Sequence, residues 1–340
     1  MRALELSYSA FLKRIKDTIK HYEMLESGDK IIAAVSGGAD SVCLLKALVD
    51  MKRTFDLQVI VANMDHGLRG KESERDSEFV RKLAVDFGLK YEHKKVKVKI
   101  SKKAGISWEE AARLKRYEFL KQAARRNRCN VIATGHTIDD QAETVLMRLI
   151  FGTSLAGLAG VFPVREEDGF RIIRPLIRVD KKDIFGFVKK AGLEYVEDKT
   201  NLDVKFLRNR VRHEILPFLE KYNPKVRRSL TNLCDSLRED FLFLDAEKKK
   251  VVRKYSDFDK ETVAIKIKDV ILQPKAVRRE IIKALFEKAG GSVKKLTYRH
   301  WMDVDYFLRT AEKNKSLSLP GCVTLTKTGR DVLFLKSDYR

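Results

Sequence analysis

The chain has 340 residues, 44% hydrophobic and 35% charged, which excludes a disordered or fibrous protein and allows two or three domains with cores of their own. It holds no apolar run of about 18 residues or more, and its first twenty residues suit an amphipathic helix better than a secretion signal, so we expect a cytoplasmic protein without membrane spans. Lys and Arg outnumber Asp and Glu by 70 to 48, and the net charge of +22 favours a polyanionic partner such as nucleic acid, although a merely solvated Lys-rich surface would give the same total.

The first part of the chain alternates predicted strands with predicted helices. Four strands are predicted at 30–35, 57–62, 90–98 and 130–134. Helical patterns follow them, from Val42, over 71–87, over 107–127 and from Ile138. This alternation predicts an α/β domain with a doubly wound, mostly parallel sheet that is covered on both faces.

The rhythm changes after Gly160. A short strand is expected at 171–174, a helix at 180–190, and then an irregular stretch to about 205. A long charged helix at 225–256 is followed by helices at 275–289 and 296–312 and by an alternating tail, 317–336, which predicts a small hairpin. We therefore predict a catalytic domain at 1–219, a helical linker at 220–256, and a small, basic α+β domain at 257–340.

A Gly-rich turn at 36–41 lies between the first strand and its helix. Gly37 and Gly38 let the backbone curl around an anion, while Ser36, Ser41 and the helix N-terminus supply donors. Asp40 would repel phosphates unless a cation such as Mg²⁺ lay between them. An ordinary turn with Ser caps would explain every member except Asp40. The run resembles the S-G-G-x-D-S loop of the ATP-pyrophosphatase (PP-loop) superfamily, which implies release of AMP and pyrophosphate from ATP.

A polar cluster at 134–144 follows the fourth strand. In the usual doubly wound order, the carboxyl ends of strands one and four flank the ligand-binding switch point. Asp140 and Glu143 are three residues apart, so they lie on one helix face. Two carboxylates there suit binding and deprotonating an amine, whose reference pKa is about 10.4 for lysine. The open alternative is a capped helix, with Asp139 as N-cap and a solvated acidic first turn.

Further motifs, in the same order along the chain, resemble the tRNA(Ile)-lysidine synthetase family. They cover residues 29–219 densely and resume weakly near the tail. The matching stretches are Asp65-His66-Gly67-Leu68-Arg69, Glu110-Ala111-Ala112-Arg113, the 136–144 cluster, Arg174-Pro175-Leu176, 197–201, Arg208-Asn209-Arg210-Val211-Arg212 and Leu319-Pro320-Gly321.

This resemblance implies an ATP-dependent carbon–nitrogen ligase. The 2-oxo oxygen of the wobble cytidine, in the CAU anticodon of an isoleucine tRNA, attacks the α-phosphate of ATP and becomes part of an AMP leaving group. The amine of free lysine then attacks the activated carbon. The implied partners are ATP, Mg²⁺, tRNA and lysine, and a homodimer is a further expectation although the residues do not define the oligomeric state.

The resemblance also implies roles for individual residues. The 36–41 loop would hold the phosphates of ATP, with Asp40 as the Mg²⁺ ligand. Four further residues would border the nucleotide: His66, Arg69, Arg113 and Arg116. Asp140 and Glu143 would recognise and deprotonate lysine beside His136, and Arg208 and Arg212 would reach the α-phosphate or the tRNA backbone. The alternatives are a surface charge for Arg69, salt bridges for Arg113 and Arg116, a packing role for His136, and a solvated basic turn around Arg208.

The C-terminal part is the more basic per residue, with 28 basic against 17 acidic side chains from residue 216 onward. It is expected to bind tRNA phosphates without reading sequence. The candidate contacts are Lys248, Lys249, Lys250, Arg278, Arg279, Lys294 and Lys295, each of which is individually more often just solvated.

Three other functions are less consistent with the sequence. A tRNA-thiolating relative generally needs a cysteine nucleophile or iron–sulfur ligands. The four cysteines here lie far apart without a C-x-x-C pair: Cys43, Cys129, Cys234 and Cys322. We therefore expect reduced, mostly buried thiols. A small-molecule amidotransferase would leave the basic C-terminal part and the motifs at 65–69 and 208–212 unexplained. A non-catalytic RNA-binding module would leave the intact loop and carboxylates unexplained.

Overall fold

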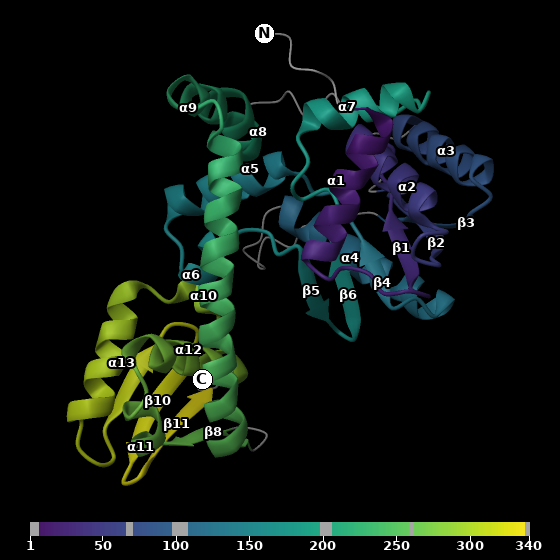
Figure 1. Ribbon diagram of the computed structural model, residues 1–340. Helices are drawn as coiled ribbons and strands as arrows, with labels where there is room; N and C mark the ends of the chain where they lie inside the picture. The colour runs from purple at the N-terminus through teal and green to yellow at the C-terminus, as the bar shows by residue number, and fades with distance from the viewer. Residues whose placement is uncertain (1–6, 66–70, 97–107, 198–205, 259–261, 337–340) are drawn as a thin grey trace. The chain divides into compact units, whose positions relative to one another are not determined.

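The computed structural model describes residues 7–65, 71–96, 108–197, 206–258 and 262–336 (Figure 1). The chain divides into two compact units, Met1–Ser236 and Leu237–Arg340, and the division falls inside one long helix, α10 (Val226–Tyr255). None of the helices within these ranges is long and apolar enough to cross a bilayer.

The first unit is built on a six-stranded sheet. Its strands are β1 (Lys30–Ala34), β2 (Gln58–Asp65), β3 (Lys90–Lys95), β4 (Val131–Ala133), β5 (Val164–Glu167) and β6 (Phe170–Ile173). Its helices before α10 are α1 (Tyr8–His21), α2 (Ala39–Met51), α3 (Lys71–Asp86), α4 (Trp108–Asn127), α5 (Ile138–Phe151), α6 (Leu155–Leu158), α7 (Lys181–Lys190), α8 (Leu207–Arg210), the π-helical turn η3 (Val211–Ile215) and α9 (Leu216–Tyr222). The strand order is β3-β2-β1-β4-β6-β5, parallel except for β5, which runs antiparallel to β6. The predicted α/β class and mostly parallel sheet are confirmed.

Strand β1 shows why helices cover both faces of this sheet. Ile31 and Ala33 belong to a core shared with α1, α2, α3 and α7, whereas Ile32 belongs to a core shared with α4. Successive side chains of a strand point to opposite faces, so one short strand supplies both cores. All three side chains are fully buried, which explains why the strand appears in the sequence as a continuous apolar run.

The switch point of the sheet lies between β1 and β4. In register, Ile32 of β1 pairs with Ile60 on one side and with Ile132 on the other. The chain extends the sheet from β1 through β2 to β3 in one direction and from β4 to β6 in the other. The carboxyl ends of β1 and β4 therefore flank the crevice at which open α/β sheets bind ligands, as the usual strand order predicted.

The second unit contains a five-stranded antiparallel sheet in the order β7-β8-β11-β10-β9. Its remaining elements are β7 (Ser256–Phe258), β8 (Thr262–Lys266), α11 (Ile267–Ile271), α12 (Lys275–Lys288), the 3₁₀ turn η4 (Val293–Lys295), α13 (Tyr298–Thr310), β9 (Ser316–Leu319), β10 (Val323–Thr328) and β11 (Asp331–Lys336). Apolar side chains of α12 and α13 pack with the strands in one core. The predicted tail hairpin is present as β10–β11, but it is part of a larger sheet because β8 pairs with β11.

All four cysteines are in the reduced thiol form, and Cys43, Cys129 and Cys234 are buried while Cys322 is half-buried. This agrees with the expectation of reduced, mostly buried thiols.

Candidate functional site

The loop between β1 and α2 folds around the hydroxyl of Ser41. This oxygen accepts hydrogen bonds from the backbone N–H groups of Ser36 and Gly37, both at 3.2 Å, and donates to the carbonyl of Gly38 at 2.9 Å. Gly37 has a φ of +95°, a left-handed conformation that L side chains rarely adopt. Gly38 is the N-cap of α2, so the loop ends at a helix terminus that carries partial positive charge. The loop is thus preformed as a turn suited to phosphate.

The two predicted clusters meet at Gly135, in the loop between β4 and α5. A Cβ atom added to Gly135 would lie 3.1 Å from the carbonyl oxygen of Asp40 and 3.2 Å from its carbon. Backbone cannot yield to such a contact as a flexible side chain could, so the close approach of the loops depends on glycine. Residues about 95 positions apart in the sequence therefore form one continuous site.

Asp40 lies half-buried at the start of α2. The pKa of Asp40 is raised to about 6, chiefly by burial; Lys181 opposes the rise, and the nearby carboxylates of Asp140 and Asp139 add to it. Lys181 Nζ lies 3.6 Å from the Asp40 carboxylate. The sequence reasoning missed Lys181; the available signal was a lysine in the first turn of α7, where the helix dipole disfavours a cation.

The donor set around Asp40 fits a magnesium ion held jointly with a triphosphate. Within the described ranges no group of three or more His, Cys, Asp or Glu residues is placed to hold a metal by itself. Mg²⁺ usually takes one or two carboxylates and completes its shell with phosphate oxygens and water. A partly buried carboxylate beside a preformed phosphate turn can serve as such a ligand, because a bound cation would favour its ionised form and offset the burial that raises its pKa.

The two carboxylates predicted to bind an amine are paired with the two arginines predicted to bind phosphate. Arg208 donates from Nη2 to Asp140 at 2.9 Å and from Nε to Glu143 at 2.7 Å. Arg212 donates to Glu143 from Nε at 2.6 Å and from Nη2 at 3.1 Å. The side chain of Glu143 is 0% exposed, so these two guanidinium groups replace its hydration. The shared face of Asp140 and Glu143 is confirmed, and a merely solvated turn around Arg208 is excluded.

Asp140 also takes part in the capping box of its own helix. Thr137 is the N-cap, because its hydroxyl accepts a hydrogen bond from the Asp140 N–H at 3.4 Å, and the Asp140 carboxylate in return accepts one from the Thr137 N–H at 2.9 Å. The alternative in which Asp139 is the N-cap is therefore wrong; Asp139 is buried and forms an ion pair with Arg227. Burial alone would raise the pKa of Asp140, but Arg208, His136 and the Thr137 N–H together lower it to about 2.

His136 and three arginines form the neighbouring part of the crevice. Burial, followed by the charge of Arg174, lowers the pKa of His136 well below its usual range. Its Nδ1 lies 2.9 Å from the hydroxyl of Thr134. Arg113 and Arg116 lie over the ring of Tyr117, at 5.6 and 5.8 Å from its centroid.

Arg174 was predicted only as part of a motif, yet it is 2% exposed at the end of β6. It donates to the carbonyl of Phe162 and to the Tyr117 hydroxyl, the latter at 3.4 Å. An arginine at the carboxyl end of a predicted strand, the edge at which parallel sheets bind ligands, was the signal in the sequence that could have identified it. His66 and Arg69 lie outside the described residues.

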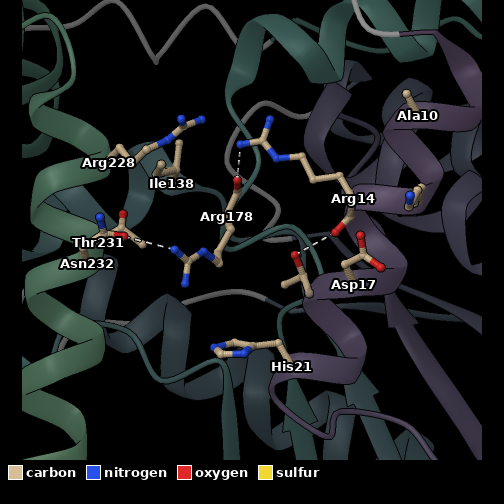
Figure 2. A pocket seen from close by; sticks show the side chains of 11 residues that line it. Ala10, Arg14, Asp17, His21, Ile138, Arg178, Arg228, Thr231 and Asn232 are labelled. Atoms are coloured by element: carbon tan, nitrogen blue, oxygen red, sulfur yellow. Dashed lines mark hydrogen bonds between the residues drawn. The ribbon is translucent and has the colours of Figure 1, made fainter.

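The segment that carries Lys181 begins at Arg178, which lines a separate cleft of about 590 Å³. Figure 2 shows this cleft with Arg14 and Asn232. Arg14 of α1 donates to the Arg178 carbonyl at 2.7 Å and to Asp183 at 2.9 Å. Arg178 in turn donates to Asn232 of α10 at 3.0 Å and forms an ion pair with Asp235 at 2.7 Å. These contacts fix residues 178–183, and hence the position of Lys181 beside Asp40.

The predicted phosphate contacts of the second unit are not equivalent. Arg278 is buried and forms an ion pair with Asp305 at 2.9 Å, so its prediction as a phosphate contact is wrong: the guanidinium is a core group. Three lysines pair with acids on the same helix: Lys248 and Lys249 with Asp245, and Lys250 with Glu247. Arg279 is half-buried and 3.8 Å from Glu280, Lys295 is exposed, and the side chain of Lys294 lies outside the described residues.

Comparison with known proteins identifies a family and several relatives of this chain. The family described as the PP-loop domain matches residues 8–219. The tRNA(Ile)-lysidine synthase of Clostridioides difficile is 33% identical over 310 residues, which cover 90% of this chain and 66% of that protein. The tRNA(Ile)-lysidine synthase of Geobacter sulfurreducens is 31% identical over 329 residues, which cover 96% and 69%. The chain thus spans about two thirds of the length of these curated relatives.

A solved structure shares the fold. The U34-tRNA thiolase NcsA from Methanococcus maripaludis, with its 4Fe-4S cluster, aligns with a TM-score of 0.57 and 20% identity over 68% of this chain and 80% of that one.

Proposed function

Because the chain belongs to the tRNA(Ile)-lysidine synthase family of PP-loop proteins, we propose that it attaches lysine to carbon 2 of the wobble cytidine in the CAU anticodon of an isoleucine tRNA. ATP is converted to AMP and pyrophosphate in the process. The observation that carries this proposal is the close approach of Gly135, which precedes Asp140 and Glu143 in the chain, to the backbone of Asp40. It supports a cation-binding role for these two acids next to a phosphate-binding role for the 36–41 loop.

The first step makes the base oxygen a leaving group. The O2 atom of cytidine attacks the α-phosphorus of ATP, a P–O bond forms, and the bond to pyrophosphate breaks. In this proposal the 36–41 loop and the N-terminus of α2 bind the departing pyrophosphate. Asp40 would hold a Mg²⁺ ion, which neutralises phosphate charge when bound. Arg113 and Arg116 border the nucleotide and add positive charge.

The second step exchanges oxygen for nitrogen. The lysine amine attacks carbon 2, the C–N bond forms, and the C–O bond to AMP breaks. Two carboxylates attract the incoming ammonium, and one of them must accept its proton before the nitrogen can attack. Asp140 is the proposed acceptor, and Glu143 holds the ammonium beside it.

Arg208 has to leave the acid pair before this step. Its guanidinium occupies both carboxylates and keeps the pKa of Asp140 low, so Asp140 is a weak base while the pair is intact. Bound phosphate offers Arg208 another negatively charged partner in place of the two carboxylates. We therefore propose that Arg208 moves from the acids to the α-phosphate as lysine enters.

Thiolation of tRNA is the second candidate and is less well supported. A cysteine nucleophile needs a lowered pKa. Burial instead raises the pKa of Cys43 well above its usual range and that of Cys129 to about 11.

The partners follow from the same proposal. The second unit binds tRNA, free lysine is the second substrate, and a homodimer stays a prediction that sedimentation equilibrium would check. The test of the function is pyrophosphate release by the full chain with ATP and Mg²⁺. It should require the tRNA, while transfer should also require lysine. Release that is independent of tRNA would refute the proposal.

A further inference from the structure

Helix α13 carries a stripe of large side chains that the core of its unit does not use. Tyr298, Met302 and Tyr306 are 69%, 40% and 70% exposed. They are spaced four residues apart, so they form one continuous line along the helix. The opposite side of α13 is buried through Val304 and Phe307. Single exposed apolar residues are ordinary, whereas an aligned set marks a surface that another molecule contacts.

This stripe is held rigidly in place. The helix begins with a capping box between Thr297 and His300, and the buried carboxylate of Asp305 pairs with Arg278 of α12 at 2.9 Å. Met302 is in contact with the neighbouring helix, since Lys275 Nζ lies 3.8 Å from its sulfur. A partner therefore meets two tyrosine rings whose backbone is already ordered, which lowers the entropic cost of binding.

The surroundings of the stripe are basic. Lys275 borders its middle, and Arg299 is exposed beside Tyr298. Arg309 lies one turn beyond Tyr306, forms an ion pair with Asp305, and keeps half of its side chain exposed. The acids of α13 are Asp303, which is exposed, and Asp305, which is already paired. Across residues 237–340, Lys and Arg outnumber Asp and Glu by 24 to 15.

We infer that the Tyr298–Met302–Tyr306 stripe binds unpaired nucleotides of RNA by stacking. Tyrosine rings next to lysine and arginine are the combination with which proteins bind single-stranded RNA, because the rings stack on bases while the cations contact the backbone. A second copy of this chain is the less favourable occupant, since it would bring the same basic border against itself. This inference rests on the proposed function in one respect: the RNA is the tRNA substrate, engaged at nucleotides outside its helices.

Fluorescence anisotropy with the full chain tests the inference. The probes are a labelled oligouridine and a blunt RNA duplex of equal length, without ATP or lysine. Tyr298→Leu and Tyr306→Leu should each weaken oligouridine binding by roughly 5- to 150-fold, leave duplex binding unchanged, and keep this difference as salt is raised. Tyr306→Phe, which retains the ring, should bind like the wild type. Tyr222→Leu, at an exposed tyrosine of the first unit, is the matched control.

Equal affinities of the wild type and both leucine variants would overturn the inference, as would equal weakening for both probes. Unchanged RNA affinity with reduced self-association in sedimentation would make the stripe an interface between copies instead. The binding assay contains neither ATP nor lysine, so its result does not depend on whether the protein transfers lysine. The proposed function can likewise hold if the stacking fails.

Discussion

Glu143→Gln should destabilise the first unit because it leaves two arginines without their shared carboxylate. The wild-type side chain is 0% exposed and accepts three hydrogen bonds, one from Arg208 and two from Arg212. Removing one partner of a buried ion pair costs about 3–5 kcal/mol. Here the arginine side chains are 36% and 20% exposed, so water compensates part of the loss. We expect the free energy of unfolding to fall by about 2–4 kcal/mol.

The two tryptophans allow this effect to be measured on one unit alone. Trp108 lies in the first unit and Trp301 in the second, so a Trp301→Phe background leaves Trp108 as the fluorescent reporter of the first. Urea unfolding of Glu143→Gln in that background gives the free-energy change, and Glu166→Gln, at an exposed acid of β5, is the matched control. A change of less than about 0.5 kcal/mol, as expected for the control, would refute the reasoning that this acid holds the network together.

Five further outcomes are expected. Asp40→Ala should abolish tRNA-dependent pyrophosphate formation, and near-normal release would remove its proposed metal role. Asp140→Asn should still permit adenylation but slow lysine transfer, seen as trapped adenylated RNA by mass spectrometry; equal loss of both steps would place Asp140 at the ATP. Because the pKa of Asp140 is lowered to about 2, its stabilising contribution is present above about pH 4 and is lost as the pH falls toward 2. The difference in unfolding free energy between the wild type and Asp140→Asn should therefore close over that range in urea titrations. A constant difference would count against the lowered pKa. Arg208→Gln should let lysine bind in calorimetry without ATP, whereas binding as weak as in the wild type would show that Arg208 does not block the acids. Gly135→Ala should lower the free energy of unfolding by about 1–3 kcal/mol and should also weaken ATP binding, because the new Cβ would lie 3.1 Å from the Asp40 backbone. An unchanged ATP affinity would mean that this contact does not shape the site.

Much of the first unit could be predicted because its signals are local. The apolar run of β1, the glycines of the 36–41 loop and the acids of α5 each identify themselves within a few residues. The meeting of the loop and the acids could also be predicted, since it follows from strand order rather than from any single contact. The exposed edge strand β5 was missed because its sequence, Val-Arg-Glu-Glu, has little apolar character.

The pairings within the site could not be predicted in the same way. Sequence reasoning assigned Asp140 and Glu143 to an amine and Arg208 to a phosphate, but it gave no reason for them to contact each other across more than 60 residues. Their opposite charges pair with each other in the folded chain because burial makes an unpaired charge costly. The position of Lys181 could not be predicted either, because only the tertiary fold brings it close to Asp40.

The mass of the modified RNA tests the proposed reaction most directly. An unmodified tRNA transcript with a CAU anticodon, incubated with the protein, ATP, Mg²⁺ and lysine, should gain the mass of lysine minus water, located at the wobble cytidine by fragmentation. An unchanged mass despite tRNA-dependent pyrophosphate release, or an exchange of oxygen for sulfur at that base, would contradict it.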